Sequence, residues 1–414
     1  MAEQVTIERI GARADGIAAG ASPVFVPGAL PGETVTVERD GDRAHLVSVD
    51  APSPERETPF CPYFGVCGGC ATQHMRHGFY QAWKRGIVAE ALRRARVEAP
   101  LGDLIDAHGE GRRRVTLHAR FPEREMRVGY MEARSHAVVE ISHCPIAELA
   151  LKQRAPDLAR ALAKALAGPR KPLDIQITAT EAGFDVDVRG HGPAGERDRP
   201  RLIDLAGSLD LARLSMHGDV LVERRPPAVT MGRAVVVPPP GSFLQATREG
   251  EAVLARLVLE ACAGAKRVAD LFSGSGPFAL RLAERAEVHA AETDRAAIAA
   301  LDRAFRSTPG LRRVSVEARD LFRRPLLTPE LDRFDAVVLD PPRAGAEAQA
   351  RPLAASKVPL VVMVSCDPVT FARDAATLIG AGYRLERVTP VDQFKHSPHV
   401  ELVGVLRREG KKRR

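Results

Sequence analysis

The chain has 414 residues, of which 45% are hydrophobic and 27% are charged, and its net charge is +7 at pH 7. This length exceeds that of one ordinary domain, so we expect two or three domains. No apolar run approaches the roughly 20 residues of a membrane span, and the N-terminus carries no signal-peptide pattern, which predicts a cytoplasmic protein without a membrane anchor. The positive charge favours an anionic partner such as nucleic acid. Nothing in the sequence requires a partner protein, and we expect a monomer.

The first 52 residues combine short apolar runs with glycine and proline turns. Residues 34–37 alternate polar and apolar side chains directly after the turn residues Pro31 and Gly32. Such punctuation predicts a small β-barrel of the oligonucleotide-binding type over residues 1–52. The same signals also fit a β appendage with no role in RNA binding. Residues 51–60 are rich in proline and charge, and they read as a linker.

Three of the six cysteines form a C-x5-C-x2-C cluster with glycines between them, and a fourth precedes Pro145. In a cytoplasmic chain, clustered cysteines indicate metal binding or catalysis more often than disulfides. Four thiolates suit an iron–sulfur cluster, which we favour, and they also suit a structural zinc ion. The expected ligands are Cys61, Cys67, Cys70 and Cys144.

Residues 53–240 are expected to form a central α+β region that contains this cluster. Apolar periodicity predicts helices over 78–96 and 151–167, and strands over 115–121 and near 173–179, 184–189 and 220–223. The run Arg112–Arg114 opens the first of these strands. Positive runs here predict either a phosphate-contacting surface or ordinary solvated faces. On the first helix, the side chains expected to be exposed are Lys84, Arg85, Arg93, Arg94 and Arg96.

From about residue 241 the pattern changes to regular alternation of strands and helices. This alternation predicts a doubly wound α/β domain over 241–414, in which ligands bind beyond the carboxyl ends of the strands. The expected strands are 267–272, 288–292, 314–317, 334–339, 358–365, 383–391 and 398–406. The expected helices are 278–285, 294–305 and 368–379.

Polar and glycine residues at the ends of the first three strands predict an adenosyl cofactor. Gly274 and Gly276 would let a ligand approach the backbone closely at a helix N-terminus. Glu292 ends the second strand, where an acidic side chain hydrogen-bonds a ribose diol, and Asp320 follows the third. Pro277 interrupts the G-x-G-x-x-G pattern, which argues against a nicotinamide dinucleotide.

Three further residues suggest catalysis at the same edge. Asp340 opens the sequence D-P-P-R after the fourth strand and would lie beside the cofactor. Cys366 stands where the fifth strand gives way to a helix capped by Asp367, so we expect the helix N-terminus to favour its thiolate. That thiolate could reach a substrate held against a methyl donor. Glu401, in the sequence H-V-E, is a candidate base, although a solvated charge is the simpler reading of a glutamate at a strand end.

The motifs S-C-D-P at 365–368, D-P-P-R at 340–343 and H-V-E at 399–401 resemble those of the bacterial RNA uracil-5-methyltransferase family. The resemblance covers nearly the whole chain and implies a class I methyltransferase domain with a Rossmann-like sheet. It also implies that residues 1–52 are a TRAM domain, and that the four clustered cysteines hold a [4Fe–4S] cluster.

The resemblance further implies a role for single residues. Phe243-Leu244-Gln245 resembles the motif whose glutamine contacts S-adenosylmethionine. Cys366 would be the nucleophile and Glu401 the base. The family usually has cysteine where this chain has Ser273, and asparagine where it has Pro277. Together with the loop residues Gly274 and Gly276, the implied S-adenosylmethionine site consists of Gln245, Phe272, Glu292, Asp320 and Asp340.

The activity implied is methylation of uracil C5 in RNA after addition of a cysteine thiolate at C6. Relatives with both a TRAM domain and a cluster act on 23S ribosomal RNA, which we take as the expected substrate, and the basic residues 407–414 would add phosphate contacts. Three alternatives stay open: a tRNA uracil-5-methyltransferase, an adenine N-methyltransferase, and a non-catalytic iron–sulfur protein that binds RNA.

Overall fold

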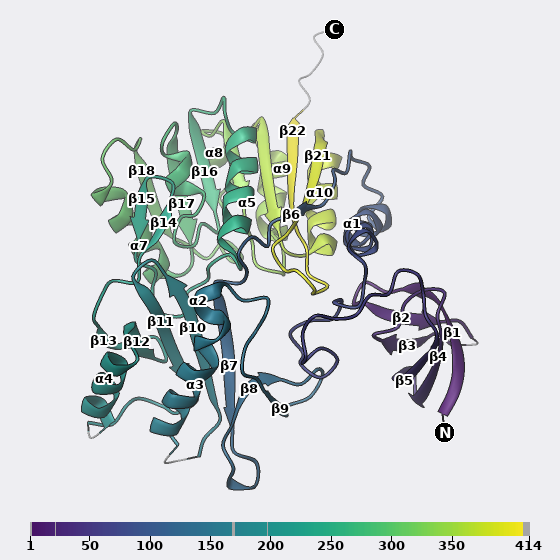
Figure 1. Ribbon diagram of the computed structural model, residues 1–414. Coiled ribbons are helices and arrows are strands. Elements are labelled where there is room, and N and C mark those ends of the chain that lie inside the picture. Colours follow the sequence, from purple (N-terminus) through teal and green to yellow (C-terminus); the bar gives the residue numbers. More distant parts are fainter. Residues whose placement is uncertain (1, 21, 168–169, 197, 409–414) are drawn as a thin grey trace.

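The computed structural model describes residues 2–20, 22–167, 170–196 and 198–408. The described strands form a closed five-stranded barrel, a seven-stranded sheet, an eight-stranded sheet and a two-stranded hairpin. Figure 1 shows the eight-stranded sheet at the top, the seven-stranded sheet at the lower left and the barrel at the lower right. None of the described helices is long and apolar enough to cross a membrane. The part of the basic C-terminal run at 409–414 lies outside the described residues.

The N-terminal barrel confirms the small β-barrel expected from the turn-rich sequence. Its strand order is β1-β2-β3-β5-β4, and β4 alternates so that Val35 and Val37 are fully buried. Gly16 packs closely against the backbone at Ala29. A Cβ at position 16 would lie 2.7 Å from the carbonyl oxygen of Ala29, so there is no room for a side chain. The strands are β1 Ala2–Ile10, β2 Asp15–Ala18, β3 Val24–Pro27, β4 Thr34–Asp40 and β5 Arg43–Ala51.

Helix α1, His77–Arg94, connects the barrel to the large sheet. Trp83 donates a hydrogen bond from Nε1 to the carbonyl oxygen of Gly11 in the barrel, at 3.0 Å. On its other side α1 packs against helix α10. The expectation that Lys84 is exposed is wrong: its side chain is fully buried and pairs with Asp392, so this lysine belongs to the core and not to a phosphate-binding face.

The central seven-stranded sheet has the order β13-β12-β11-β10-β7-β8-β9 and is covered by helices α3 and α4. Alternating apolar residues of β10, such as Ile175 and Ile177, face the core under α3. Its strands are β7 Arg114–Arg120, β8 Arg127–Met131, β9 Val138–Glu140, β10 Leu173–Thr180, β11 Gly183–Arg189, β12 Leu211–Met216 and β13 Asp219–Glu223. Its helices are α2 Leu149–Lys152, α3 Arg154–Ala165 and α4 Asp198–Ser208, with a 3₁₀ turn at Pro122–Arg124.

The eight-stranded sheet confirms the doubly wound α/β fold. Its order is β18-β17-β16-β19-β20-β22-β21-β6, and the first five strands run parallel. One face packs against α5, α6 and α7, and the other against α1, α9 and α10. The strands are β16 Arg267–Leu271, β17 Glu287–Glu292, β18 Val314–Ala318, β19 Ala336–Leu339, β20 Leu360–Ser365, β21 Tyr383–Asp392 and β22 Glu401–Arg408, with β14 Val229–Met231 and β15 Ala234–Val236 as a separate hairpin. The helices are α5 Arg248–Ala261, α6 Ala279–Leu282, α7 Arg295–Ser307, α8 Thr328–Leu331, α9 Glu347–Ala355 and α10 Pro368–Gly380.

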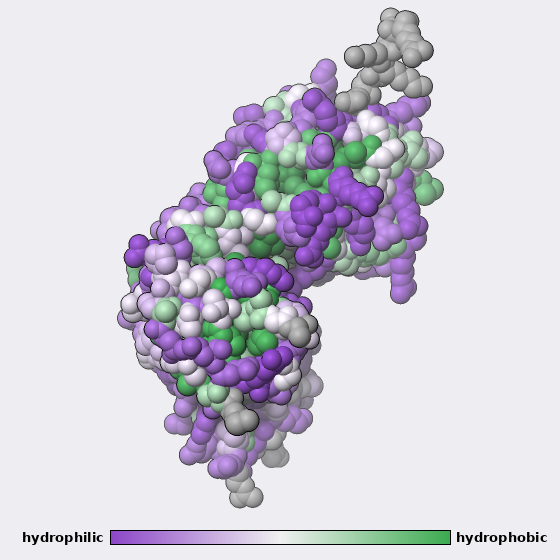
Figure 2. All heavy atoms as spheres, turned by 90° about the vertical axis from the view of Figure 1, so that its right-hand side faces the viewer, coloured by the Kyte–Doolittle hydropathy of each residue, from purple (hydrophilic) through white to green (hydrophobic). Residues whose placement is uncertain are grey.

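Two details differ from the sequence expectations. The helix expected over 278–285 is reduced to the single turn of α6, and β22 starts at Glu401 rather than at 398. Strand β6, Ile105–Asp106, lies in the expected central region but pairs with β21 at the edge of the large sheet. Figure 2, which views the barrel side, shows hydrophilic residues in purple over most of that face, with smaller hydrophobic areas in green between them.

Candidate active site

The strand register brings the candidate catalytic residues to one edge of the large sheet. Leu271 of β16 pairs with Leu339 of β19, so the residues that follow both strands, including Asp340, lie at the same level. Ser365 of β20 pairs with Leu402 of the antiparallel strand β22. Cys366 directly follows Ser365, and Glu401 directly precedes Leu402. The charges of Glu401 and Asp340 both act on the Cys366 thiol, so the three side chains lie near one another.

The loop after β16 has the backbone shape of a ligand cradle. Phe272, Gly274 and Gly276 all have positive φ angles, of 65°, 52° and 96°. The side chain of Glu292 closes the loop, since its Oε2 accepts a hydrogen bond from the Gly274 N–H at 2.9 Å. A Cβ at Gly276 would lie 2.8 Å from Cγ of Leu301, so this position requires glycine.

Two buried hydroxyls in this loop fit the prediction of a polar ligand. The side-chain oxygens of Ser273 and Ser275 are buried and have no hydrogen-bond partner among the described residues. Buried hydroxyls are normally paired, so their orientation suits an S-adenosylmethionine molecule in the loop. The carbonyl oxygen of Pro277, the residue that departs from the family pattern, accepts a hydrogen bond from Arg281 at 2.6 Å.

Asp320 lies at the same edge but serves a local turn. Its Oδ1 accepts hydrogen bonds from the backbone N–H groups of Phe322 and Arg323, at 3.0 and 3.2 Å. This turn brings the ring of Phe322 to 5.4 Å from the ring of Phe272. The sequence interpretation did not single out Phe322, because a lone aromatic residue after an acidic one carries no distinctive signal.

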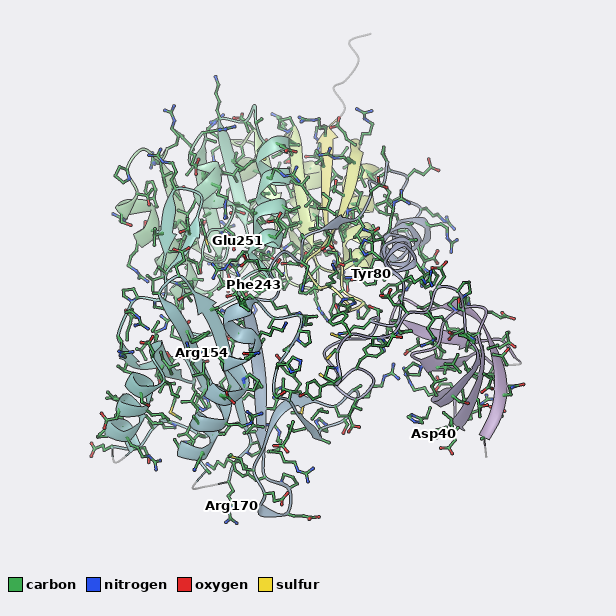
Figure 3. All side chains as sticks on the ribbon, in the orientation of Figure 1. Asp40, Tyr80, Arg154, Arg170, Phe243 and Glu251 are labelled. Carbon is green, nitrogen blue, oxygen red and sulfur yellow. The ribbon has the colours of Figure 1, made fainter. Side chains whose placement is uncertain are left out.

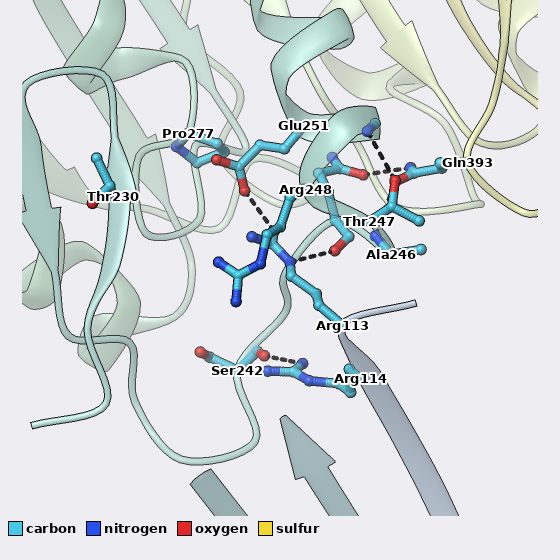
Figure 4. A network of polar contacts seen from close by, with 12 residues as sticks. Arg113, Arg114, Thr230, Ser242, Ala246, Thr247, Arg248, Glu251, Pro277 and Gln393 are labelled. Carbon is cyan, nitrogen blue, oxygen red and sulfur yellow. Dashed lines mark hydrogen bonds and ion pairs between the residues drawn. The ribbon is translucent and has the colours of Figure 1, made fainter. Parts of the chain in front are cut away.

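Gln245 is buried and is held in place from the central region. Its carbonyl oxygen accepts a hydrogen bond from Nε of Arg113 at 2.9 Å, and its Nε2 lies 3.5 Å from Oδ2 of Asp340. Arg113 also pairs with Glu251 at 2.5 Å (Figure 4). Figure 3 places Glu251 and the neighbouring Phe243 at the junction of the two large sheets.

The expected phosphate-contacting run at 112–114 is therefore only partly available. Arg113 is buried in this junction, and Arg114 is occupied by Thr178 and by the carbonyl oxygen of Ser242. The prediction failed at these two positions because charge in a sequence does not distinguish a solvated arginine from one that is paired in the interior.

Two acidic groups at the edge, Glu401 and Asp340, hold their protons more tightly than usual. Burial, with the charge of Asp340 adding to it, raises the pKa of Glu401 to about 8. Burial and the charge of Glu292 raise the pKa of Asp340 to about 7. The alternative reading of Glu401 as a solvated charge does not hold, since the residue is only 3% exposed.

The expectation that the helix N-terminus favours the Cys366 thiolate is also wrong in the free protein. Burial, together with the charges of Glu401 and Asp340, raises the pKa of Cys366 to about 11. The first N–H groups of α10 are taken up by the cap residue Asp367, which accepts from Val369 and Thr370 at 2.9 and 3.1 Å. The helix end therefore stabilises a carboxylate and leaves the thiol neutral.

Arg343 and His399 join the two motifs on either side of the thiol. Nη2 of Arg343 lies 3.1 and 3.0 Å from the two ring nitrogens of His399. Burial and the charge of Arg343 lower the pKa of His399 to about 4, so the ring is neutral at pH 7. The D-P-P-R loop is thereby fixed against the H-V-E segment.

The four clustered cysteines lie in one region, as expected, but they do not form a ligand set. Burial raises the pKa of Cys67, and the charges of Cys144 and Cys61 add to it; burial also raises the pKa of Cys70 to about 12. Tyr63 ties the two segments together through a 3.0 Å contact between its hydroxyl and Ser142. In the part of the chain that the structure describes, no three His, Cys, Asp or Glu side chains are arranged to hold a metal ion. The donor chemistry suits an iron–sulfur cluster, and the thiols lie near enough for their charges to act on one another.

A doubly wound sheet with a glycine-containing loop after β16 is the architecture of an α/β domain that binds an adenosyl or nucleotide ligand. The family model described as tRNA (uracil-5-)-methyltransferase matches residues 238–409. An uncharacterized RNA methyltransferase of Brucella melitensis is 47% identical over 404 residues, which are 97% of this chain and 97% of that protein. The 23S rRNA (uracil(1939)-C(5))-methyltransferase of Chromohalobacter salexigens is 34% identical over 435 residues, covering 99% of this chain and 90% of its own length.

The chain belongs to the RNA uracil-5-methyltransferase family. Its fold is similar to that of the tRNA (uracil-54, C5)-methyltransferase of Pyrococcus abyssi, solved with S-adenosyl-L-homocysteine, with a TM-score of 0.73 at 22% identity. The match covers 98% of this chain and 100% of that one.

Proposed function

We propose that this protein transfers a methyl group from S-adenosylmethionine to C5 of a uracil in RNA, with Cys366 as nucleophile and Glu401 as base. The observation that carries the proposal is the β20–β22 register, because its last pair, Ser365 and Leu402, adjoins both Cys366 and the buried Glu401. Gln245, Phe272, Gly274, Gly276, Glu292, Asp320 and Asp340 would hold S-adenosylmethionine.

Cys366 and Glu401 are needed because C5 of uracil is a poor nucleophile. The Cys366 sulfur, with its proton released to solvent, forms a bond to C6, and the electrons of the C5–C6 double bond move into an enolate with density at C5. S-adenosylmethionine, when bound, would supply the electrophilic methyl group to C5, and cleavage of its sulfur–methyl bond would leave S-adenosyl-L-homocysteine. The Glu401 carboxylate then removes the C5 proton, the double bond re-forms and the Cys366 sulfur leaves.

In the free site, Glu401 and Cys366 both have raised pKa values. With pKa values of about 8 for Glu401 and 11 for Cys366, both groups are mainly neutral at pH 7. A cationic ligand at this edge would favour their anionic forms, since a positive charge lowers the pKa of a neighbouring acid. The thiolate fraction of Cys366 would therefore rise when the donor site is filled.

Single substitutions at the two residues test the mechanism. We expect Cys366→Ala to form no 5-methyluridine in RNA, because no enolate can arise. We expect Glu401→Gln to accumulate a covalent RNA adduct that is retained on a denaturing gel, because the C5 proton stays in place. Full turnover by Cys366→Ala would exclude the thiol mechanism. Methyladenine in place of 5-methyluridine would favour an adenine N-methyltransferase.

We propose 23S ribosomal RNA as the substrate, since a relative that covers nearly the whole chain is a 23S rRNA (uracil(1939)-C(5))-methyltransferase. A tRNA substrate is the second candidate, because the matching family model carries a tRNA description. Mass-spectrometric mapping of 5-methyluridine in ribosomal and transfer RNA from a deletion strain distinguishes them. A uridine that loses its methyl group only in tRNA would overturn the ribosomal assignment.

We propose that the chain divides into 1–52, 53–240 and 241–414, and that the first part is a TRAM-like barrel that contacts RNA. We also propose that Cys61, Cys67, Cys70 and Cys144 close around a [4Fe–4S] cluster when one is supplied. Anaerobic reconstitution should then give visible charge-transfer absorption that Cys144→Ser loses. Stoichiometric zinc in the purified protein, with no absorption after reconstitution, would favour the zinc alternative.

A further inference from the structure

Gln393 lies directly beside the proposed catalytic base and has no place in the mechanism so far. It follows strand β21, and its side chain is fully buried. Its Nε2 donates hydrogen bonds to Oε1 of Gln245 at 2.6 Å and to Oε1 of Glu401 at 3.2 Å. Its Oε1 accepts a hydrogen bond from the backbone N–H of Ala246 at 2.9 Å. One side chain thus bridges the proposed donor site and the proposed base.

The orientation of this amide is determined by its partners. The Ala246 N–H can only donate, so the Gln393 oxygen must face it and the NH₂ group must face Gln245 and Glu401. The two hydrogens of Nε2 are then both used. As a consequence, Oε1 of Glu401 must accept and cannot carry a proton toward Gln393. The other oxygen, Oε2, is left as the atom that takes up and releases the proton.

The surrounding backbone is shaped to hold Gln393 in this position. At Gly250 in the first turn of α5, a Cβ would lie 2.6 Å from Oε1 and 2.7 Å from Cβ of Gln393, so the absence of a side chain there makes room for it. The preceding residue, Asp392, is fixed by buried Lys84 and by the hydroxyl of Tyr80 at 2.5 Å. Gln393 is therefore clamped from α5 on one side and from α1 on the other.

We propose that Gln393 is a positioning residue that holds Oε1 of Glu401 as a hydrogen-bond acceptor and couples the base to Gln245 of the donor site. This inference rests on the proposed function of Glu401. The charged and titratable groups that face Glu401 are Asp340 after β19, Arg343 in the D-P-P-R loop and Cys366 after β20. Asp340 favours the protonated form of Glu401 and Arg343 opposes it. The Gln393 hydrogen bond adds to Arg343, so its loss makes Glu401 harder to ionise.

The test is Gln393→Met, which keeps the length of the side chain but cannot donate. The rate at which the covalent RNA adduct resolves should rise with pH through the pKa of Glu401 in both proteins. We expect the midpoint in the variant to lie about 1 pH unit higher, because a donor to the carboxylate is gone. At pH 7 the resolution rate should fall roughly tenfold and the adduct should accumulate. Binding of S-adenosylmethionine should weaken as well, because Gln245 loses a partner.

One control and one alternative variant separate a loss of stability from a change in the ionisation of Glu401. Gln349→Met removes another fully buried glutamine, which bonds only to the backbone of Leu326, and it should lower stability without moving the pH midpoint. If Gln393→Met does not fold, Gln393→Asn retains a buried amide but withdraws it from Glu401, and the same midpoint shift is expected. An unshifted midpoint in a folded variant overturns the proposal for Gln393. A wild-type protein that forms neither adduct nor 5-methyluridine overturns the proposed function itself.

Discussion

At the scale of single residues, the candidate site contains acidic groups in an environment that disfavours their charge. Glu401 is 3% exposed, and burial raises its pKa to about 8. In the unfolded chain a glutamate titrates at about 4.3. Between these two pH values the folded protein binds a proton that the unfolded chain has released. The free energy of unfolding therefore decreases as the pH rises through this window.

Glu401→Gln should consequently stabilise the protein at alkaline pH. We expect its Tm to exceed that of the wild type by roughly 2–5 °C at pH 8, and the difference to disappear at about pH 3, where both states of the wild type are protonated. Thermal unfolding at the two pH values measures the effect. Glu249→Gln, at an exposed position of α5, is the matched control and should show no such pH-dependent gain. A variant less stable than the wild type at pH 8 would contradict the raised pKa.

At the scale of elements, a buried ion pair joins α1 to the end of β21. Lys84 donates to Oδ1 of Asp392 and to the carbonyl oxygen of Phe394, the latter at 3.0 Å. Both charged side chains are nearly inaccessible. Burial lowers the pKa of Lys84 to about 8, even though Asp392 acts in the opposite direction. The pair therefore costs desolvation, and its main effect is to specify how α1 docks.

Lys84→Met should leave the Asp392 carboxylate buried without a cation. We expect a loss of about 3–5 kcal/mol in the free energy of unfolding, and recovery of most of it in Lys84→Met/Asp392→Leu. Denaturant unfolding measures both variants. Arg93→Met on the same helix removes an exposed partner of Glu90 and should cost less than about 1 kcal/mol. Equal losses for Lys84→Met and Arg93→Met would show that the buried pair has no special weight.

The sequence predicted the helices and strands that carry a clear hydrophobic pattern and missed several that do not. The strand at 358–365 and the helix at 368–379 were predicted nearly as found, since an apolar run and a capped Asp367-Pro368 start mark them clearly. Strand β12, Leu211–Met216, was missed because all its residues are buried and it shows no alternation. Helix α5 was not predicted, although its N-cap Thr247 and its apolar residues at 253, 254, 257 and 258 mark an amphipathic helix.

For the site, the motifs identified the candidate residues. They predicted neither the pKa values of these residues nor the side chains that hold them in position. Cys366 and Glu401 were found from S-C-D-P and H-V-E, and their roles stay predictions. Their raised pKa values depend on burial by segments far apart in the chain, which no local pattern encodes. Gln393 was missed for the same reason: its partners Gln245 and Ala246 lie almost 150 residues away along the chain.

At the scale of the whole molecule, two polar contacts join the barrel to α1 and the central sheet, beside an apolar cluster at the base of the barrel. Arg134, in the turn between β8 and β9, pairs with Asp15 of the barrel at 2.6 Å, and Trp83 of α1 bonds to Gly11 at 3.0 Å. Figure 1 shows the barrel standing beside the central sheet, below the α/β domain. If barrel and active site contact the same RNA, as we propose, a fixed arrangement spares the entropy of ordering one against the other.

Trp83→Phe/Arg134→Ala should therefore loosen the barrel and weaken RNA binding without changing the donor site. Phenylalanine keeps an aromatic ring under the barrel but removes the donor to Gly11, and alanine removes one of the two arginines that pair with Asp15. We expect the radius of gyration from small-angle X-ray scattering to increase and the Kd for RNA to rise roughly three- to tenfold, since the effective concentration of the second contact falls. The Kd for S-adenosylmethionine should stay unchanged.

Arg127→Ala controls for the loss of charge. It removes an exposed arginine of β8 whose ion pair, among the described residues, is with Glu125. This variant should alter the salt dependence of RNA binding but not the scattering. A looser barrel with unchanged RNA affinity would show that the barrel makes no contact with the RNA.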